Sequence, residues 1–363
     1  MERPNAVPFD EAPFILFWET TRACDLACLH CRACAVPDRD PRELTTREGK
    51  RLLDEAAAMG TKLVVLTGGD PAKRSDLVQL VRHGTNLGLR MALTPSATPL
   101  VTRDWLAEMQ DAGIARVAIS IDGSSAGTHD RFRGVVGSWS RSHQILDHAR
   151  DLGISTQANT SVCLDNVGEL PLLATQLAER RIDLWGVFFV VPVGRARVDQ
   201  TLPAAQVERL LVWLAALSKR APYDVKTTAA PQFRRVLLQH KAKRNDIVGL
   251  RQAGPSDEGV MRVRRGINDG QGVAFVSHTG DIQPSGFLPI VAGNVRMEGL
   301  RRTYRDSATF RALRDPDALG GACGVCEFRK VCGGSRARGY AATGDLLAED
   351  PACPYEPPAA RAS

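Results

Sequence analysis

Short apolar segments and amphipathic segments alternate strictly from Phe14 to Leu217 of this 363-residue chain. The apolar segments predict six strands, at Phe14–Glu19, Lys62–Thr67, Arg90–Thr94, Arg116–Ile121, Ser155–Val162 and Leu184–Val190. The amphipathic segments predict helices at Arg47–Met59, Ser75–Leu87, Thr102–Asp111, Ser140–Leu152, Gly168–Arg180 and Pro203–Leu217. Such alternation is typical of a parallel sheet with right-handed crossovers. Six units are fewer than the eight of a closed barrel. We therefore expect an α/β fold with an open, partial (βα)6 TIM-like barrel, whose chemistry gathers at the carboxyl ends of the strands.

The pattern changes in the last third of the chain. The alternation of apolar and amphipathic segments weakens over residues 221–265, and His240–Gly259 is polar. We therefore expect a connection or lid over residues 221–265. Two apolar segments flank the turn His278–Asp281 and predict a hairpin, and Leu300–Leu313 predicts a helix. Gly320–Tyr355 is too poor in apolar residues to fold without a metal or cluster. We expect a barrel over residues 1–220, the connection over 221–265, and a small Cys-rich α+β domain over 266–363.

Composition and charge narrow the class of protein. A hydrophobic fraction of 44% and a charged fraction of 24% are ordinary for a soluble globular chain. The net charge of +6 is spread over 47 basic and 41 acidic residues and does not favour a nucleic-acid partner. The N-terminus lacks the pattern of a signal peptide, and the longest apolar run, Val187–Val193, is too short to span a membrane. We expect a cytoplasmic protein, where clustered cysteines serve as metal or cluster ligands rather than disulfides.

Cys24, Cys28 and Cys31 form a C-x3-C-x2-C pattern directly after the first predicted strand. A 4Fe–4S cluster held by three thiolates leaves one iron open to a small-molecule ligand. The alternatives are a zinc site or chance clustering. Cys34 and Cys163 have no such pattern, and we interpret both as packed side chains.

Polar and glycine residues follow the next predicted strands. Gly68 and Gly69 let the backbone approach a ligand closely. The other candidates at strand ends, each of which can equally be a cap or surface residue, are Asp70, Thr94, Ser96, Ser120, Asp122, Arg133 and Asn159. Because these residues follow successive predicted strands, together they indicate one ligand site more strongly than any of them does alone.

A second group of four cysteines, Cys323, Cys326, Cys332 and Cys353, forms C-x2-C-x5-C with a distant fourth member. From spacing alone, four thiolates suit a closed 4Fe–4S cluster and a structural zinc about equally.

The three-cysteine loop and the strand-end motifs resemble the radical S-adenosylmethionine (SAM) superfamily. The resemblance implies that Cys24, Cys28 and Cys31 are the catalytic cluster ligands and that the open iron binds the amino and carboxylate groups of SAM. His30 stands where that family usually has an aromatic residue before the third Cys, and Gly68-Gly69-Asp70 resembles its GGE motif, which contacts the SAM ammonium group. The remaining SAM contacts implied are Thr94, Ser96, Ser120, Asp122, Arg133 for the carboxylate, and Asn159.

The C-terminal cysteines resemble the SPASM or twitch extensions of that superfamily, which carry auxiliary clusters. Ser285 and Ser335 stand where two further cysteine ligands are expected, and no Cys occurs between Cys163 and Cys323. The resemblance therefore implies one auxiliary 4Fe–4S cluster, ligated fully by protein, in addition to the SAM-binding cluster. A saturated cluster suits electron transfer or a structural role, and donation of a cluster sulfide is the alternative.

Further motifs resemble the radical SAM proteins of alternative haem biosynthesis, which act on propionate or acetate side chains of tetrapyrroles. They are Phe17–Cys24, His30–Ala33, Leu66–Gly69, His129–Gly134, Val191–Arg195 and Cys332–Arg338. The resemblance implies reductive cleavage of SAM to a 5′-deoxyadenosyl radical, hydrogen abstraction from a small molecule, and a flavodoxin or ferredoxin as reductant. Because Ser285 and Ser335 differ from the haem enzymes, the substrate stays open.

Three substrate classes remain: a tetrapyrrole carboxylate, a nucleoside or sugar (with the auxiliary cluster as sulfur donor), and a peptide. The short segment before the first strand argues against a peptide. A non-enzymatic zinc or iron scaffold is the alternative from another class, and the SAM-type motifs disfavour it. His278 is interpreted as a turn residue, and Arg195, Arg336 and Arg338 are either carboxylate ligands or surface charges.

Overall fold

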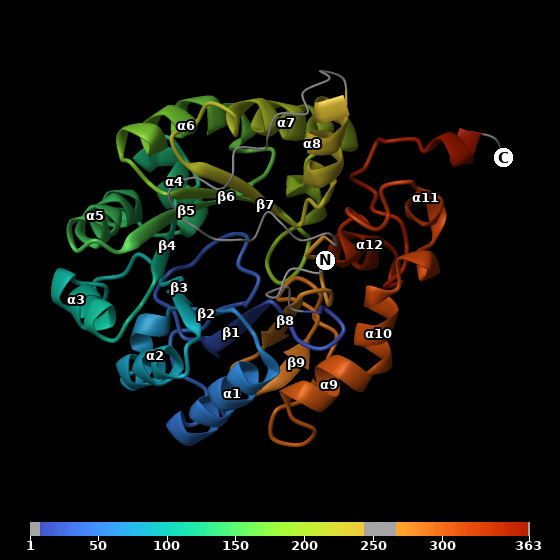
Figure 1. Cartoon of the computed structure of the whole chain (residues 1–363). Helices are drawn as coiled ribbons and strands as arrows, with labels where there is room; N and C mark the ends of the chain where they lie inside the picture. The colour runs from blue at the N-terminus through green and yellow to red at the C-terminus, as the bar shows by residue number, and fades with distance from the viewer. Residues whose placement is uncertain (1–7, 243–265, 362–363) are drawn as a thin grey trace.

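The computed structural model describes residues 8–242 and 266–361, and its central element is one curved sheet (Figure 1). The strand order is β10-β9-β8-β1-β2-β3-β4-β5-β6-β7, and β8 through β7 run parallel to one another. The strands are β1 Ile15–Thr21, β2 Leu63–Gly68, β3 Arg90–Leu93, β4 Arg116–Ser120, β5 Ser155–Val162, β6 Leu184–Phe189, β7 Asp224–Thr228, β8 Val273–Val276, β9 Asp281–Gln283 and β10 Gly293–Asn294. Among the described residues β7 and β10 form the two edges, so the barrel is open.

This architecture confirms the expected α/β fold with a partial barrel, and the six predicted strands lie within two residues of their predicted ends. The expectation that residues 221–265 are only a connection is wrong in its first part, where β7 and α8 (Gln232–Ala242) extend the barrel. The reason is that Val225 is the one buried residue of β7, so the strand has no apolar run to reveal it. The rest of the expected lid, residues 243–265, lies outside the described residues.

Helices cover the outer face of the sheet (Figure 1). In the barrel they are α1 Thr46–Met59, α2 Leu77–Asn86, α3 Arg103–Asp111, α4 Ala126–Arg133, α5 Ser138–Asp151, α6 Leu170–Glu179 and α7 Ala204–Leu217. Local chemistry sets their ends. Thr45 and Glu48 form a capping box at α1, and Thr102 caps α3 through the backbone N–H of Trp105.

The main core lies between these helices and the sheet. Trp18 and Leu16 of β1 are fully buried, and they belong to one apolar cluster with Leu53 of α1. Helix α1 lies so close to β1 that a Cβ on Gly49 would overlap the Trp18 ring. Burial of such side chains is the dominant stabilising contribution, at about 25 cal/mol per Å² of apolar surface. The core thus holds the strand ends in fixed positions.

The C-terminal elements lie along one side of the barrel (Figure 1). They are the antiparallel hairpin β8–β9, α9 Leu300–Asp306, α10 Ala308–Arg314, α11 Gly321–Gly324 and α12 Arg336–Thr343. The hairpin confirms its prediction. The single helix predicted over Leu300–Leu313 is wrong, because the chain breaks at Ser307, whose side chain caps α10. No helix in the described residues is long and apolar enough to cross a membrane.

Candidate functional site

The loop that follows β1 carries four cysteines, all of which are free thiols. Cys24 and Cys28 are buried, and Cys31 packs against the same small cluster. Backbone N–H groups point at two of the sulfurs: Leu26 N donates to Cys24 Sγ at 3.3 Å and Ala35 N donates to Cys31 Sγ at 3.4 Å. Burial raises the pKa of the Cys24 thiol. Because burial opposes a free thiolate, a cationic ligand such as iron is needed to hold this sulfur in its charged form.

The two glycines at the end of β2 let this loop lie against the sheet. Gly69 N donates to Thr21 O at 2.8 Å, and Asp70 N donates to Ala23 O at 2.7 Å. A Cβ on Gly68 would overlap Thr21 O, and one on Gly69 would overlap Ala23 O. Gly68 also has φ +150°, in the region that L side chains rarely adopt. The pair therefore fixes where the cysteine loop begins.

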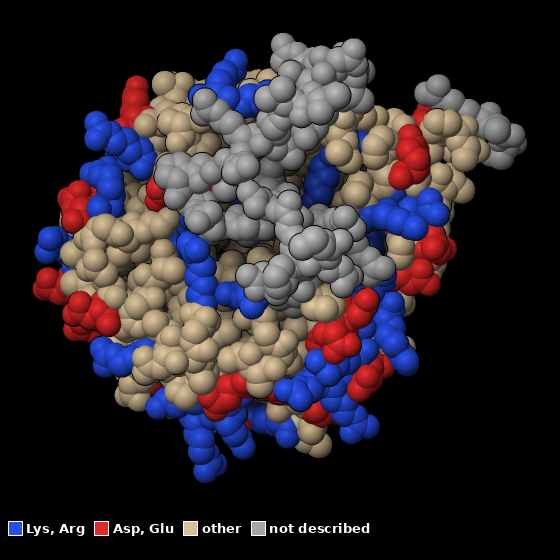
Figure 2. Space-filling model, in the orientation of Figure 1, with Lys and Arg blue, Asp and Glu red and all other residues tan. Residues whose placement is uncertain are grey.

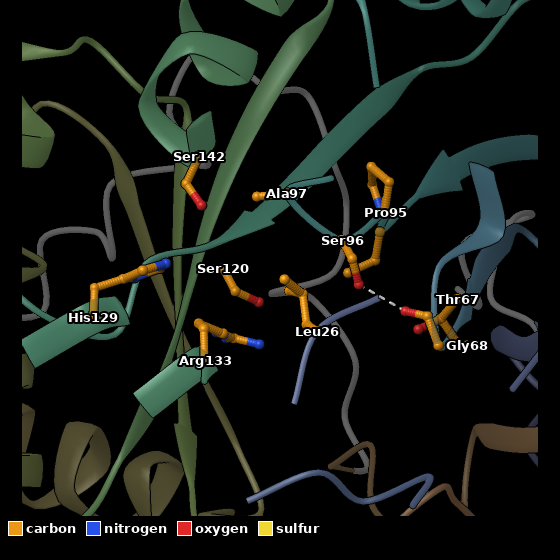
Figure 3. A pocket seen from close by; sticks show the side chains of 12 residues that line it. Leu26, Thr67, Gly68, Pro95, Ser96, Ala97, Ser120, His129, Arg133 and Ser142 are labelled. Atoms are coloured by element: carbon orange, nitrogen blue, oxygen red, sulfur yellow. Dashed lines mark hydrogen bonds between the residues drawn. The ribbon is translucent and has the colours of Figure 1, made fainter. Parts of the chain in front are cut away.

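A cavity opens beside the loop at the carboxyl ends of β2, β3 and β4 (Figure 3). Its lining residues are Leu26, Thr67, Gly68, Gly69, Thr94, Pro95, Ser96, Ala97, Ser120, His129, Arg133 and Ser142. The predicted site residues Gly68, Gly69, Thr94, Ser96, Ser120 and Arg133 are thus brought together. Ser96 Oγ also lies 3.3 Å from Cys24 Sγ, so the cavity adjoins the cysteine loop.

Arg133 connects the cavity to the cysteine loop. Its Nη1 donates to Cys28 Sγ at 3.7 Å, and its other terminal nitrogen pairs with the buried carboxylate of Asp122. Burial lowers the pKa of Arg133, but the charges of Asp122 and Cys28 outweigh it, so the pKa is raised and the guanidinium stays charged. Asp122 Oδ1 accepts from Ser161 N at 2.7 Å, so this carboxylate supports Arg133 from the β5 side.

Asp70 has a different position from the one implied by its resemblance to the GGE motif. Its carboxylate is fully buried and is not among the residues that line the cavity. Oδ2 accepts from Thr98 Oγ1 at 2.6 Å, and Oδ1 accepts from Ser96 N and Ala72 N, both at 3.2 Å. Burial raises the pKa of Asp70. These contacts make Asp70 a brace between the loops after β2 and β3.

Besides Asp122, which supports Arg133, two other predicted contacts also lie outside the cavity lining. The His30 ring stacks on Phe132 of α4, with 4.1 Å between centroids. Asn159 Oδ1 accepts from Gln157 Nε2 at 2.6 Å within β5. Both residues thus contact neighbouring elements of the barrel in this structure.

His129 and Ser142 line the cavity, although neither was among the candidates from sequence. His129 Nδ1 accepts from Asp122 N at 3.1 Å, so the ring proton resides on Nε2. His129 Nε2 and Ser142 Oγ are both buried without a hydrogen-bond partner in the described structure. Figure 3 shows the two side chains extending toward the same space. Burial and the charge of Arg133 lower the pKa of His129 to about 3, so the ring is a neutral donor. The sequence run His129–Arg133 could have indicated His129, but only Arg133 of that run was predicted as a site residue.

His278 joins the hairpin β8–β9 to the cysteine loop. Its Nδ1 lies 2.9 Å from Glu19 Oε1 of β1, and Glu19 Oε2 accepts from Arg32 Nη2 at 2.7 Å. Burial raises the pKa of Glu19, but hydrogen bonds from His278 and Arg32 outweigh it, so the pKa is lowered. Arg32 also lies over the Phe275 ring of β8 at 4.6 Å. His278 therefore does more than form a turn: it ties the C-terminal elements to the cysteine loop.

The four C-terminal cysteines are free thiols near one another and near buried arginines. Arg336 is almost fully buried; it donates to Ala348 O at 2.6 Å and its Nη2 lies 3.6 Å from Cys323 Sγ. Gly334 N donates to Cys332 Sγ at 3.5 Å. Burial, with contributions from Cys353 and Cys323, raises the pKa of Cys332 to about 12. Positive neighbours and N–H donors suit an anionic thiolate cluster.

The two serines that replace expected cysteines have structural roles here. Ser335 caps α12 by accepting from Arg338 N at 3.3 Å, and Ser285 Oγ accepts from Phe287 N at 3.2 Å. Arg338 pairs with the buried Asp350 at 2.7 Å, so it is a structural ion pair and not a free surface charge.

The donor sets fit iron–sulfur clusters. Within residues 8–242 and 266–361, no three His, Cys, Asp or Glu side chains converge on the position of one metal ion. In a 4Fe–4S cluster each thiolate binds its own iron, so the sulfurs lie around a cluster rather than around one ion. Three free thiols beside a cavity with unpartnered donors fit an open cluster with a polar organic ligand.

Comparisons with known proteins agree with this site. A family model described as "Radical SAM superfamily" matches residues 18–170, which contain the cysteine loop and the cavity. An "AdoMet-dependent heme synthase" of Methanosarcina barkeri is 37% identical over 351 residues, covering 97% of this chain and 99% of the relative. A protein of the same name from Oleidesulfovibrio alaskensis is 39% identical and covers 94% of this chain and 87% of its own length.

Among solved structures, Streptococcus suis SuiB bound to S-adenosylmethionine matches with a TM-score of 0.73. The match covers 95% of this chain and 78% of that chain at 16% sequence identity, so it supports the fold alone.

Proposed function

The chain belongs to the radical SAM superfamily and is an enzyme of it, and we propose that it abstracts a hydrogen atom from a carboxylate-bearing side chain of a tetrapyrrole. The superfamily implies SAM and a 4Fe–4S cluster as cofactors. When bound, they supply reductive cleavage of SAM to methionine and a 5′-deoxyadenosyl radical. The observation that carries the proposal is the cavity beside three free cysteines, with its unpartnered buried donors.

Each residue of the site has a proposed role. Cys24, Cys28 and Cys31 hold the cluster, and Arg133 orients the SAM carboxylate while donating to Cys28. The other residues proposed to contact or position SAM are His30, Gly68, Gly69, Asp70, Thr94, Ser96, Ser120, Asp122, His129, Ser142 and Asn159. Of these, Asp70, Asp122, His30 and Asn159 act through their neighbours, because their side chains bond to or stack on protein groups.

The tetrapyrrole is favoured over a nucleoside, a sugar or a peptide by the curated relatives. Two proteins named as haem synthases match nearly the whole chain, and a further relative at 28% identity is named "Pre-heme d1 synthase". A peptide is the second candidate, because a "PqqA peptide cyclase" matches at 28% identity. The higher identity of the haem synthases, 37% and 39% against 28%, favours the tetrapyrrole.

We further propose that Cys323, Cys326, Cys332 and Cys353 hold one auxiliary 4Fe–4S cluster. Buried Arg336 beside Cys323 supports this proposal, because an iron–sulfur cluster with four thiolates is anionic. We also propose a domain division in which the barrel extends through β7 and α8 to residue 242 and the cluster domain begins at residue 266. We also propose a flavodoxin or ferredoxin as the reductant and a location in the reducing cytoplasm, which agrees with the absence of disulfides among the nine cysteines.

The test uses anaerobically reconstituted enzyme with SAM, dithionite and a propionate-bearing iron tetrapyrrole. The expected result is 5′-deoxyadenosine whose amount rises when the tetrapyrrole is present. Cys24→Ala should abolish it, whereas Cys163→Ala, a buried cysteine after β5, serves as the matched control. Product at the Cys24→Ala level would overturn the assigned chemistry, and product that the tetrapyrrole does not stimulate would overturn the substrate class.

A further inference from the structure

Arg195 lies on the loop after β6, next to the cysteine loop. Arg195 N donates to Cys31 O at 3.0 Å, which places this residue beside the third cluster cysteine. Gly194 precedes it with φ +67°, and a Cβ there would overlap Cys31 O and Arg32 O. Both contacts hold the backbone of Arg195 at one position relative to the cluster loop.

The guanidinium of Arg195 has buried donors with nothing to donate to. Its Nε and Nη2 are inaccessible to solvent and have no hydrogen-bond partner in the described structure. Arg195 as a whole is only partly buried, but these two nitrogens have neither contact with solvent nor an acceptor among the described residues, and an anionic ligand would satisfy both. Two residues along, Arg197 pairs with Asp199 at the surface, so the loop itself does not lack acidic partners.

The SAM cavity has its own arginine. Arg133 lines that cavity, whereas Arg195 is not among its lining residues. Arg133 donates to Cys28 Sγ, whereas the Arg195 backbone donates to Cys31 O, so the two arginines approach the cluster loop at different cysteines. A second unpaired cation on the β6 side indicates a second anionic ligand, separate from the SAM carboxylate.

The surroundings of this loop suit an amphiphilic ligand. Val191 and Val193, just before Arg195, pack in an apolar cluster with Phe287 and Leu288 from the segment after β9. Val193 and Phe287 are only partly buried. Figure 2 shows Lys and Arg side chains around a hollow on one face of the molecule. At the Arg195 loop, an apolar body with carboxylate arms matches the apolar cluster and the unpaired nitrogens of Arg195.

We propose that Arg195 is the receptor for a carboxylate of the substrate, which it binds beside the cluster loop. This inference rests on the proposed function and names a contact for its substrate. The planar fork of the guanidinium matches a carboxylate in a bidentate pair. Because the Arg195 backbone is bonded to Cys31, the same residue sets where the substrate lies relative to the cluster.

The experiment measures binding of coproporphyrin III and of its methyl ester to the reconstituted full-length enzyme by absorbance titration. The ester keeps the ring and removes the negative charges. We expect wild type to bind the acid more tightly than the ester, and Arg195→Gln to weaken acid binding by about 10- to 100-fold without affecting the ester. Arg195→Lys, which keeps the charge without the fork, should lie between. Arg197→Gln is the matched control and should bind like wild type.

Three results distinguish a failure of this inference from a failure of the proposed function. Equal binding of the acid by wild type and Arg195→Gln would overturn the inference and leave the proposed function standing. A loss for acid and ester alike, or an equal loss in SAM affinity, would also overturn it, because Arg195 would then act in packing or on SAM. Failure of wild type to bind either compound would contradict the tetrapyrrole substrate, and the inference with it. Iron content, measured for each variant, confirms that the cluster loop is loaded.

Discussion

At the scale of single residues, unpartnered buried atoms indicate a ligand contact where they line a cavity. His129 Nε2 and Ser142 Oγ are buried without partners in the described structure, and both residues line the same cavity. A polar ligand there would satisfy both atoms. Asp70 shows the opposite case, since Thr98, Ser96 and Ala72 satisfy its carboxylate. Sequence alone indicated Asp70 but neither His129 nor Ser142, and it cannot distinguish a residue that contacts a ligand from one that supports the loops around it.

His129 gives a prediction with a pH signature. Replacing it with Phe should weaken SAM binding about fivefold, the effect of one neutral hydrogen bond. With a pKa of about 3 the ring stays neutral above pH 5, so the loss should be constant from pH 6 to pH 8. Equilibrium dialysis with labelled SAM measures this.

The control for His129→Phe is His143→Phe, on α5. His143 is also buried, and burial lowers its pKa to about 4, but it does not line the cavity. It should bind SAM like wild type. A loss for His129→Phe that appears only on one side of pH 6.5, or an equal loss for His143→Phe, would contradict the assigned role.

At the scale of elements, the close approach of the β1 and β2 ends positions the cysteine loop. Gly69→Ala would place a Cβ against Ala23 O, and neither backbone segment is free to move. We expect the variant to lose about 1–3 kcal/mol of unfolding free energy, as overpacked sites do. Urea unfolding of the protein without iron measures this, and reconstitution should yield less iron at the N-terminal site. Gly168→Ala is the control, since its Cβ meets nothing within 4 Å. Equal stability of the two variants would contradict this role.

The C-terminal cysteine group gives a prediction in iron content. Reconstituted wild type should hold about eight irons per chain, four for each 4Fe–4S cluster. Cys326→Ala should hold about four, because one ligand set is broken, while 5′-deoxyadenosine formation without substrate should persist at the other cluster. Cys163→Ala should keep the full iron content. About four irons in wild type, or bound zinc, would contradict the auxiliary cluster.

How much of the elements was predictable depends on their burial pattern. β5, Ser155–Val162, was predicted with its observed bounds, and six of the seven residues after Ser155 are buried in the sheet. β7 and α4 were not predicted. β7 has one buried residue, and α4 is a short helix with a weak apolar face that places His129 and Arg133 at the cavity. Both missed elements bury few apolar side chains, so their sequences lack the hydrophobic period that the prediction used.

At the scale of the whole molecule, contacts across the sheet join the hairpin β8–β9 to β1 and the N-terminal cysteine loop. β8 pairs with β1, and His278 and Arg32 meet on Glu19, so the C-terminal elements bear directly on the cysteine loop. The strand–helix alternation predicted the partial barrel, whereas the two cluster sites were predicted from the cysteine spacing together with the family resemblance, and the second of them stays a prediction. Neither pattern revealed the Glu19–His278 contact, because its partners lie 259 residues apart. Long-range pairings of this kind depend on the folded topology.

The central claim is that this enzyme removes a hydrogen atom from a carboxylate-bearing side chain of a tetrapyrrole. The most direct measurement is mass spectrometry of 5′-deoxyadenosine formed with a tetrapyrrole deuterated in its propionate arms. If the proposed function is correct, wild type yields 5′-deoxyadenosine that carries one deuterium, and Cys24→Ala yields no product. Product without deuterium, from enzyme that binds the tetrapyrrole and cleaves SAM, would contradict it.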